Sequence, residues 1–140
     1  MQVSVTRTIE FASSLRYWLG DLSAEENERR FGREAGRHGH NYRLEVTLRG
    51  EPDPVTGMVI NLSELKQVLE AQVMSRFDHR DLNSDCDYFE KQPPTPENLA
   101  LVLFEILEAA LPKHRLERIR LHSDAETFVD VFGGGTGGGA

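Results

Sequence analysis

The chain has 140 residues, of which 39% are hydrophobic and 28% are charged, and its formal net charge is −7. This length and composition are typical of a single globular domain with one hydrophobic core. No basic block offsets the acidic residues, which argues against a nucleic-acid partner. The single cysteine, Cys86, rules out an internal disulfide and fits a reducing compartment. Because no apolar run approaches the roughly 18–20 residues that span a bilayer, and the first residues lack the apolar stretch of a signal peptide, we expect a cytoplasmic protein without a membrane partner.

Two segments near the N-terminus predict β-strands. Apolar and polar side chains alternate in residues 3–11 and again in residues 42–49, and a period of two indicates a strand with one buried face. If the second strand extends backwards with the same parity, His40 and His38 point to the same side, with Cα atoms roughly 6–7 Å apart. Two histidines so placed are half of a zinc site, because a catalytic zinc usually takes three protein ligands. The alternative is a polar pair at the entrance of a strand.

Three helices are expected further along the chain. A Ser-x-x-Glu capping box predicts a short helix over residues 24–30. An apolar stripe at helical spacing predicts a second helix over residues 62–77. The third begins at Pro96, with Thr95 as its N-cap, because proline is favoured in the first turn of a helix.

The remaining segments complete the predicted fold. Strands are expected over residues 117–123 and 127–132, irregular chain over 78–90, and a flexible Gly-rich tail over 133–140. Residues 1–132 then form one α+β domain, in which four antiparallel strands carry two long helices on one face. The other face of such a sheet and its open edges favour association with further copies of the chain.

Several short motifs follow one another along the chain. They are Phe11-Ala-Ser-Ser, Leu22-Ser-Ala-Glu-Glu-Asn27, His38-Gly-His-Asn-Tyr42, Asp53-Pro-Val-Thr-Gly-Met58, Asp78-His79-x-x-Leu82-Asn83 and Thr95-x-Glu97-Asn98. Taken together and in this order, over nearly the whole domain, they resemble the family of 6-pyruvoyl- and 6-carboxy-tetrahydropterin synthases. The resemblance implies the tunnelling fold (T-fold), a ββααββ unit that assembles into barrel-shaped homo-oligomers, commonly hexamers, with active sites at subunit interfaces.

The resemblance also implies a reaction and the residues that carry it. Enzymes of the family are lyases that convert 7,8-dihydroneopterin triphosphate, by loss of triphosphate or by cleavage of the side chain. Zinc polarises the substrate, a cysteine is the base, and an Asp–His pair relays protons. On this pattern His38 and His40 match two zinc ligands, and Asp78 and His79 match the relay. Glu97, in the Thr95 motif, matches a residue that faces the pterin.

Three positions depart from the family pattern. Leu15 stands where the first zinc-ligand histidine is expected, and Glu34 stands where the catalytic cysteine is expected. Ser123, followed by Asp124, replaces the glutamate that anchors the pterin ring with a pair of charge-assisted hydrogen bonds. Cys86 does not supply the missing thiol, because it falls in a variable loop of the family.

Each of these residues has a structural alternative. Glu34 is expected to act as a base, or as a third zinc ligand in a His₂Glu set, unless it is a solvated loop carboxylate; His122 or His79 could complete the zinc site instead. Without the resemblance, Asp78 and His79 would be a polar pair at the surface. Glu97 also favours the dipole of its helix.

The sequence therefore leaves two main hypotheses for the function. The first is a pterin-synthase-like lyase with altered chemistry, in which Thr95, Glu97, Ser123 and Asp124 bind the substrate. The second is a catalytically inactive homologue that binds a different heterocycle or regulates a partner. A purely structural oligomer is a third and weaker idea.

Overall fold

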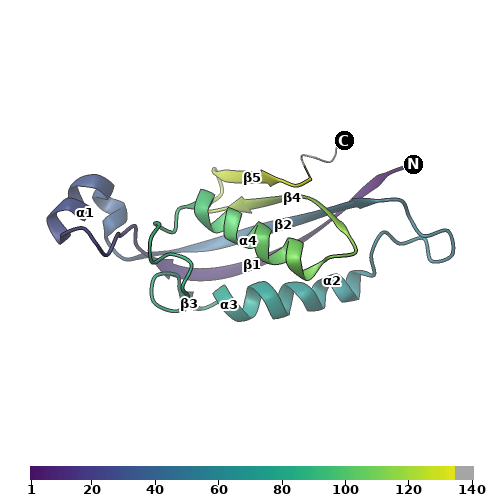
Figure 1. Ribbon diagram of the computed structural model, residues 1–140, viewed down its shortest axis with the longest axis horizontal. Coiled ribbons are helices and arrows are strands. Elements are labelled where there is room, and N and C mark those ends of the chain that lie inside the picture. The colour runs from purple at the N-terminus through teal and green to yellow at the C-terminus, as the bar shows by residue number, and fades with distance from the viewer. Residues whose placement is uncertain (135–140) are drawn as a thin grey trace.

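The computed structural model describes residues 1–134, which form one curved sheet with helices packed on one face (Figure 1). The sheet has five strands in the order β3-β1-β2-β4-β5. The strands are β1 (Val3–Leu15), β2 (His38–Gly50), β3 (Arg80–Asp81), β4 (Arg115–His122) and β5 (Phe128–Phe132). The helices are α1 (Ala24–Phe31), α2 (Leu62–Leu69), α3 (Ser75–Phe77) and α4 (Pro96–Ala110), with a 3-10 turn η1 (Gly32–Ala35) and a π-helical turn η2 (Glu70–Met74).

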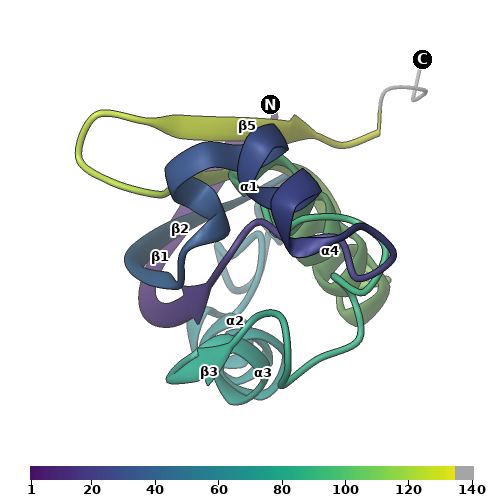
Figure 2. The same cartoon turned by 90° about the vertical axis from the view of Figure 1, so that its left-hand side faces the viewer.

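The predicted fold class is confirmed. β1 pairs with β2, β2 with β4 and β4 with β5, all antiparallel. Viewed from its end, the sheet curls from β5 to β1 around the side on which α2 and α4 lie (Figure 2). The short helix α1 stands apart from this layer, at the end of the sheet where β1 finishes and β2 starts (Figure 1).

The second strand extends back to the two histidines, as the alternation predicted. β2 begins at His38, and the register with β1 places Leu15 opposite His38 and Ser13 opposite His40. The same register places Phe11 opposite Tyr42, and the two rings stack with centroids 5.1 Å apart. The histidines therefore continue the row of side chains that faces the helices.

The predicted helices are present, with one irregularity. The helix expected over residues 62–77 is a rod made of α2, η2 and α3 in succession. The caps expected at Ser23, Asn61 and Thr95 are made, since each side chain accepts a hydrogen bond from a backbone N–H of the first turn. The hydroxyl of Thr95 is thus already used as a helix cap, and no bound ligand is needed to explain why a threonine stands there.

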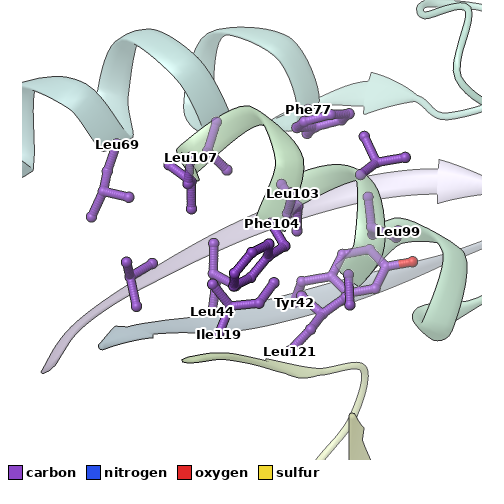
Figure 3. Close-up of a cluster of buried hydrophobic side chains, with 14 of the residues drawn as sticks. Tyr42, Leu44, Leu69, Phe77, Leu99, Leu103, Phe104, Leu107, Ile119 and Leu121 are labelled. Atoms are coloured by element: carbon purple, nitrogen blue, oxygen red, sulfur yellow. The ribbon is translucent and has the colours of Figure 1, made fainter. Parts of the chain in front are cut away.

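The hydrophobic core lies between the sheet and the two helical rods (Figure 3). Leucines of α4 and of α2 face the apolar residues of the three central strands, because each element turns its apolar side inwards. Among the buried side chains are Tyr42, Leu44, Leu69, Phe77, Leu99, Leu103, Phe104, Leu107, Ile119 and Leu121.

The sheet also contains a short strand that the sequence analysis placed in an irregular segment. β3 pairs in parallel with Ser13 and Ser14 of β1, so that the sheet is mixed and has five strands where four were predicted. Two residues are too few to show a period of two, and the pairing depends on side chains that bind the backbone of β1, as described below. The pattern of apolar residues could not have revealed it.

The C-terminal end of the described chain still belongs to the domain. The N–H of Gly133 donates to the carbonyl of Glu117, and a Cβ at residue 133 would lie 2.1 Å from the carbonyl oxygen of Leu116. The rest of the tail that was predicted over residues 133–140, from residue 135 on, lies outside the described residues. Within residues 1–134 the helices are too short or too polar to cross a bilayer.

Candidate functional site

His38 and His40, the histidine pair, lie side by side on the helix-facing side of β2, with ring centroids 5.2 Å apart. Nδ1 of His38 is 2.8 Å from the carbonyl oxygen of Gly36. Because a carbonyl can only accept, Nδ1 carries a proton. A hydrogen bond of this kind is the usual way in which a metal-binding histidine is oriented.

Glu34 is in contact with the histidine pair. Its Oε2 lies 2.9 Å from Nε2 of His38, although the direction of approach is not that of a hydrogen bond. The backbone of the same turn is fixed, because the N–H of Tyr17 donates to the carbonyl of Glu34 at 2.7 Å. Glu34 therefore lies beside the imidazole of His38.

The third ligand expected for zinc is missing. Leu15 is buried opposite His38 and offers no donor atom. His122 is held by Glu45, whose Oε2 lies 2.6 Å from its Nε2. Across the described residues, no three His, Cys, Asp or Glu side chains converge as metal ligands. The side chains as they stand do not fit zinc, and its binding stays a prediction.

Asp78 and His79, the relay pair, are in direct contact. Nδ1 of His79 lies 3.0 Å from Oδ2 of Asp78. Oδ1 of Asp78 accepts the backbone N–H of Ala12 at 2.9 Å, and this bond is the main reason why the pKa of Asp78 is lowered. His79 has a positive φ of 59°, which is uncommon for a residue with a side chain. The imidazole of His79 is therefore exposed to solvent and contacts a carboxylate, that of Asp78, which stays ionised at neutral pH.

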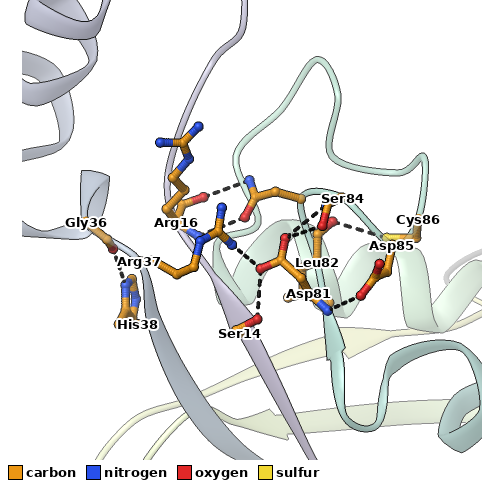
Figure 4. A network of polar contacts seen from close by, with 11 residues as sticks. Ser14, Arg16, Gly36, Arg37, His38, Asp81, Leu82, Ser84, Asp85 and Cys86 are labelled. Atoms are coloured by element: carbon orange, nitrogen blue, oxygen red, sulfur yellow. Dashed lines mark hydrogen bonds and ion pairs between the residues drawn. The ribbon is translucent and has the colours of Figure 1, made fainter.

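The segment that follows the relay pair is attached along the end of β1 (Figure 4). The side-chain amide of Asn83 accepts the N–H of Arg16 at 2.8 Å and donates to the carbonyl of Arg16 at 2.9 Å, as a strand neighbour would. Asp81 accepts the hydroxyl of Ser14 at 2.8 Å and also binds Arg37. These roles of Asp81 and Arg37 were missed from the sequence, where neither residue forms part of a recognisable pair.

Two adjoining hollows open at the end of the sheet that carries the histidine pair. One has a volume of about 530 Å³ and reaches the relay pair at His79. The other has a volume of about 620 Å³ and reaches Ser123 and Asp124. Both are bordered by Gly39, His40 and Asn41. The hollows thus bring four of the predicted site residues to one end of the sheet, namely His40, His79, Ser123 and Asp124, whereas Glu34, Asp78, Thr95 and Glu97 do not line either of them.

Ser123 and Asp124 lie beyond the end of β4, which stops at His122. The alternation of a strand would send them to opposite sides, but in the loop both line the same hollow. Ser123 is buried, whereas Asp124 is exposed and its Oδ1 accepts the N–H of Glu126 at 2.8 Å. Asp124 is the carboxylate nearest in the chain to the position of the missing glutamate, which Ser123 occupies.

Tyr17 adds a residue that sequence reasoning missed. Its ring contacts that of His38, with centroids 6.2 Å apart, and packs edge-on against Phe31. Burial raises the pKa of Tyr17, and the nearby carboxylates of Glu34 and Glu97 raise it further. The phenol therefore keeps its proton, and the exposed Glu97 of α4 lies close enough to Tyr17 to affect it.

Comparison with known proteins supports the same grouping. A sequence model of the family described as 6-pyruvoyl tetrahydropterin synthase matches residues 4–133. The 6-pyruvoyl tetrahydrobiopterin synthase of Pongo abelii is 39% identical over 130 residues, which cover 91% of this chain and 90% of that protein. Among solved structures, the 6-pyruvoyl tetrahydropterin synthase of Caenorhabditis elegans has a TM-score of 0.87 at 33% identity, over 95% of this chain and 96% of that chain.

The resemblance inferred from the motifs is thereby confirmed, and so, at the level of the family, is the prediction of an enzyme. The roles of the individual residues stay predictions. This chain belongs to the 6-pyruvoyl tetrahydropterin synthase family.

Proposed function

We propose that this chain is a lyase that acts on a substrate like dihydroneopterin triphosphate and that Glu34 is its base. The observation that carries the proposal is the distance of 2.9 Å between Oε2 of Glu34 and Nε2 of His38. Loss of triphosphate and cleavage of the side chain both need a group that removes a proton from the substrate. A carboxylate beside an imidazole can do this near neutral pH.

The relay pair supplies the second proton-transfer group. Asp78 orients His79 through the contact between Oδ2 and Nδ1, which leaves Nε2 of His79 free to give or take a proton. His79 borders one hollow, and Ser123 and Asp124 border the adjoining one. In the proposed complex the reacting side chain lies towards His79 and the heterocycle lies towards Asp124. Thr95 and Glu97, at the start of α4, are proposed to contact the substrate from the helix side.

The proposed steps use side chains alone. Zinc, the cofactor that the family resemblance implies, would require a third donor beside His38 and His40, and Glu34 is the nearest candidate. Across residues 1–134 the donors present do not converge on a metal.

A homo-oligomer, with a hexamer as the expected size, is part of the same proposal. Within one chain β5 lies at an edge of the sheet, and β1 has a neighbour on its other edge only at Ser13 and Ser14. Phe128 and Phe132 of β5 expose apolar side chains. Unpaired strand edges with exposed apolar residues favour pairing between copies of the chain. Light scattering during gel filtration measures the number of chains in the oligomer.

Turnover of dihydroneopterin triphosphate by the purified chain tests the proposal. We expect a pterin product from the wild type and a loss of at least about a hundredfold in Glu34→Gln, as for other general bases. Glu28→Gln, which changes an exposed carboxylate of α1, is the matched control and keeps full activity.

The second hypothesis, a binding module without catalysis, makes a different prediction. The two hollows would then hold a different heterocycle, with a shift in thermal stability, while no product forms from a pterin triphosphate. Wild-type protein that stays inactive with every pterin triphosphate offered contradicts the lyase. Activity that appears only after Leu15→His, Glu34→Cys and Ser123→Glu are combined would show that the scaffold had lost catalysis.

A further inference from the structure

Arg37 links the two parts of the candidate site directly. It precedes the histidine pair at the start of β2, and its guanidinium donates to Oδ1 of Asp81 (Figure 4). Asp81 lies in β3, two positions after His79. The Arg37–Asp81 link therefore joins the strand that carries the histidine pair to the segment that carries the relay pair.

Asp81 is held firmly enough to serve as the fixed end of this link. Its Oδ1 also accepts the hydroxyl of Ser14 at 2.8 Å, and its Oδ2 accepts the N–H and the hydroxyl of Ser84 at 3.0 and 2.8 Å. Its own N–H donates to Asp85 at 2.7 Å. Although burial opposes it, these hydrogen bonds lower the pKa of Asp81, so the carboxylate is ionised at neutral pH.

The other attachments of this segment run to β1. The backbone N–H of His79 donates to Ala12 at 2.7 Å, the N–H of Leu82 donates to Ser14 at 2.8 Å, and Asn83 binds the backbone of Arg16. These hydrogen bonds attach the segment to β1 and to Arg16, and none of them reaches the β2 side. The Arg37–Asp81 link supplies a contact on that side.

We propose that Arg37 and Asp81 are positioning residues, which hold the histidine pair and the relay pair at the separation that a single substrate needs. This inference rests on the proposed function, because it assumes that both pairs act on the same molecule. A displacement of about 1 Å in an active site can slow a reaction by about a hundredfold. Loss of the link should therefore lower kcat and leave KM nearly unchanged.

Arg37→Ala is the test variant, and Arg49→Ala is its matched control. Arg49 lies in β2, the strand that Arg37 precedes, and pairs with Glu117 at 3.2 Å, with 44% of its side chain exposed against 49% for Arg37. Both changes remove one surface ion pair, so both should lower thermal stability by a similar small amount. We expect kcat to fall about ten- to a hundredfold in Arg37→Ala, with KM within about twofold, and no change in Arg49→Ala.

Two further variants separate positioning from general damage. Arg37→Lys keeps a cation that can reach Asp81, and we expect it to recover most of the lost kcat. In an Asp81→Asn background, Arg37→Ala should cause little additional loss, because the two residues act through the same contact. Independent losses, or no rescue by lysine, would overturn the proposal.

Amide hydrogen exchange in the free protein tests the Arg37–Asp81 link independently of catalytic activity. Faster exchange at His79 and Leu82 in Arg37→Ala, and not in Arg49→Ala, supports the link. Unchanged exchange at both amides overturns it, whatever the activity. Faster exchange in a protein whose wild type converts no pterin would support the link as a structural tie and overturn the proposed function.

Discussion

Leu15 lies directly opposite His38 in the antiparallel pairing of β1 with β2, and only 1% of its surface is exposed. Residues that face each other in this way have Cβ atoms about 4.5–5.5 Å apart. The backbone therefore places residue 15 where a side chain can reach the same point as the imidazole of His38. What the position lacks is a donor atom, because leucine has no lone pair to offer a metal.

Leu15→His should create a zinc site. A third imidazole beside His38 and His40 completes the ligand number that zinc usually takes at a catalytic centre. We expect about one zinc per chain in the variant after dialysis, and much less in the wild type, measured by elemental analysis.

The histidine pair supplies the control for this experiment. Adding His38→Ala to Leu15→His should remove the bound zinc again, while circular dichroism shows that both proteins are folded. Wild-type protein that already retains one zinc per chain would contradict the prediction and would make Glu34 the first residue to mutate in the search for the third ligand.

Tyr42→Phe should leave the protein as stable as the wild type or slightly more stable. The hydroxyl of Tyr42 is buried, with none of its residue surface exposed, and has no hydrogen-bond partner among residues 1–134. Burial also raises the pKa of this phenol. An unpaired buried hydroxyl contributes nothing that phenylalanine would lose, so the change in unfolding free energy should stay within about 1 kcal/mol.

Urea unfolding measures this change, and Tyr42→Ala is the comparison. Removing the whole ring, which stacks on Phe11, should cost about 3–5 kcal/mol. A loss of more than about 2 kcal/mol in Tyr42→Phe would show that the hydroxyl is paired, for instance through a buried water.

The parts of the fold that follow a local period could be predicted from the sequence. Alternation gave the extent of β2 as far as His38, and the helical stripe gave the rod over residues 62–77. The side of β2 on which His38 and His40 lie also follows from parity alone. These features depend on neighbours a few residues apart, which a single sequence shows directly.

The arrangement of the site depends on contacts between distant parts of the chain and could not be predicted in the same way. Arg37 and Asp81 are 44 positions apart, and neither side chain follows a period. Strand parity could not place Asp124, because β4 ends at His122. β3 was missed because neither its parallel pairing with β1 nor the side-chain bonds of Asn83 to the backbone of Arg16 appear in a pattern of apolar residues.

Asn83→Ala should loosen the segment that carries the relay pair. The change removes two hydrogen bonds to the backbone of Arg16 and leaves those partly buried groups without a partner. We expect a loss of about 2–3 kcal/mol in unfolding free energy. Hydrogen exchange at Leu82 should also become faster, because its N–H bond to Ser14 lies in the same attachment.

The control for this change is Asn41→Ala. Asn41 is exposed on β2 and lies opposite Ala12 in the register, so its loss should alter unfolding free energy by less than about 0.5 kcal/mol. Equal effects of the two changes would mean that Asn83 does not attach the segment.

The contribution of Asp78 to stability should depend on pH. Its carboxylate accepts the N–H of Ala12 and contacts His79, and its pKa is lowered in the folded protein. A lowered pKa means that the stabilisation is complete above the unfolded pKa of about 3.9 and is lost as the pH falls through the folded value.

Asp78→Asn should therefore be less stable than the wild type by about 1–2 kcal/mol near neutral pH, and the difference should shrink as the pH falls below about 4. Urea unfolding across this pH range measures it. Asp21→Asn, at an exposed turn, is the control and should follow the wild type throughout. A difference between wild type and Asp78→Asn that stays constant down to about pH 2 would show that the lost stability comes from packing and not from the charge of Asp78.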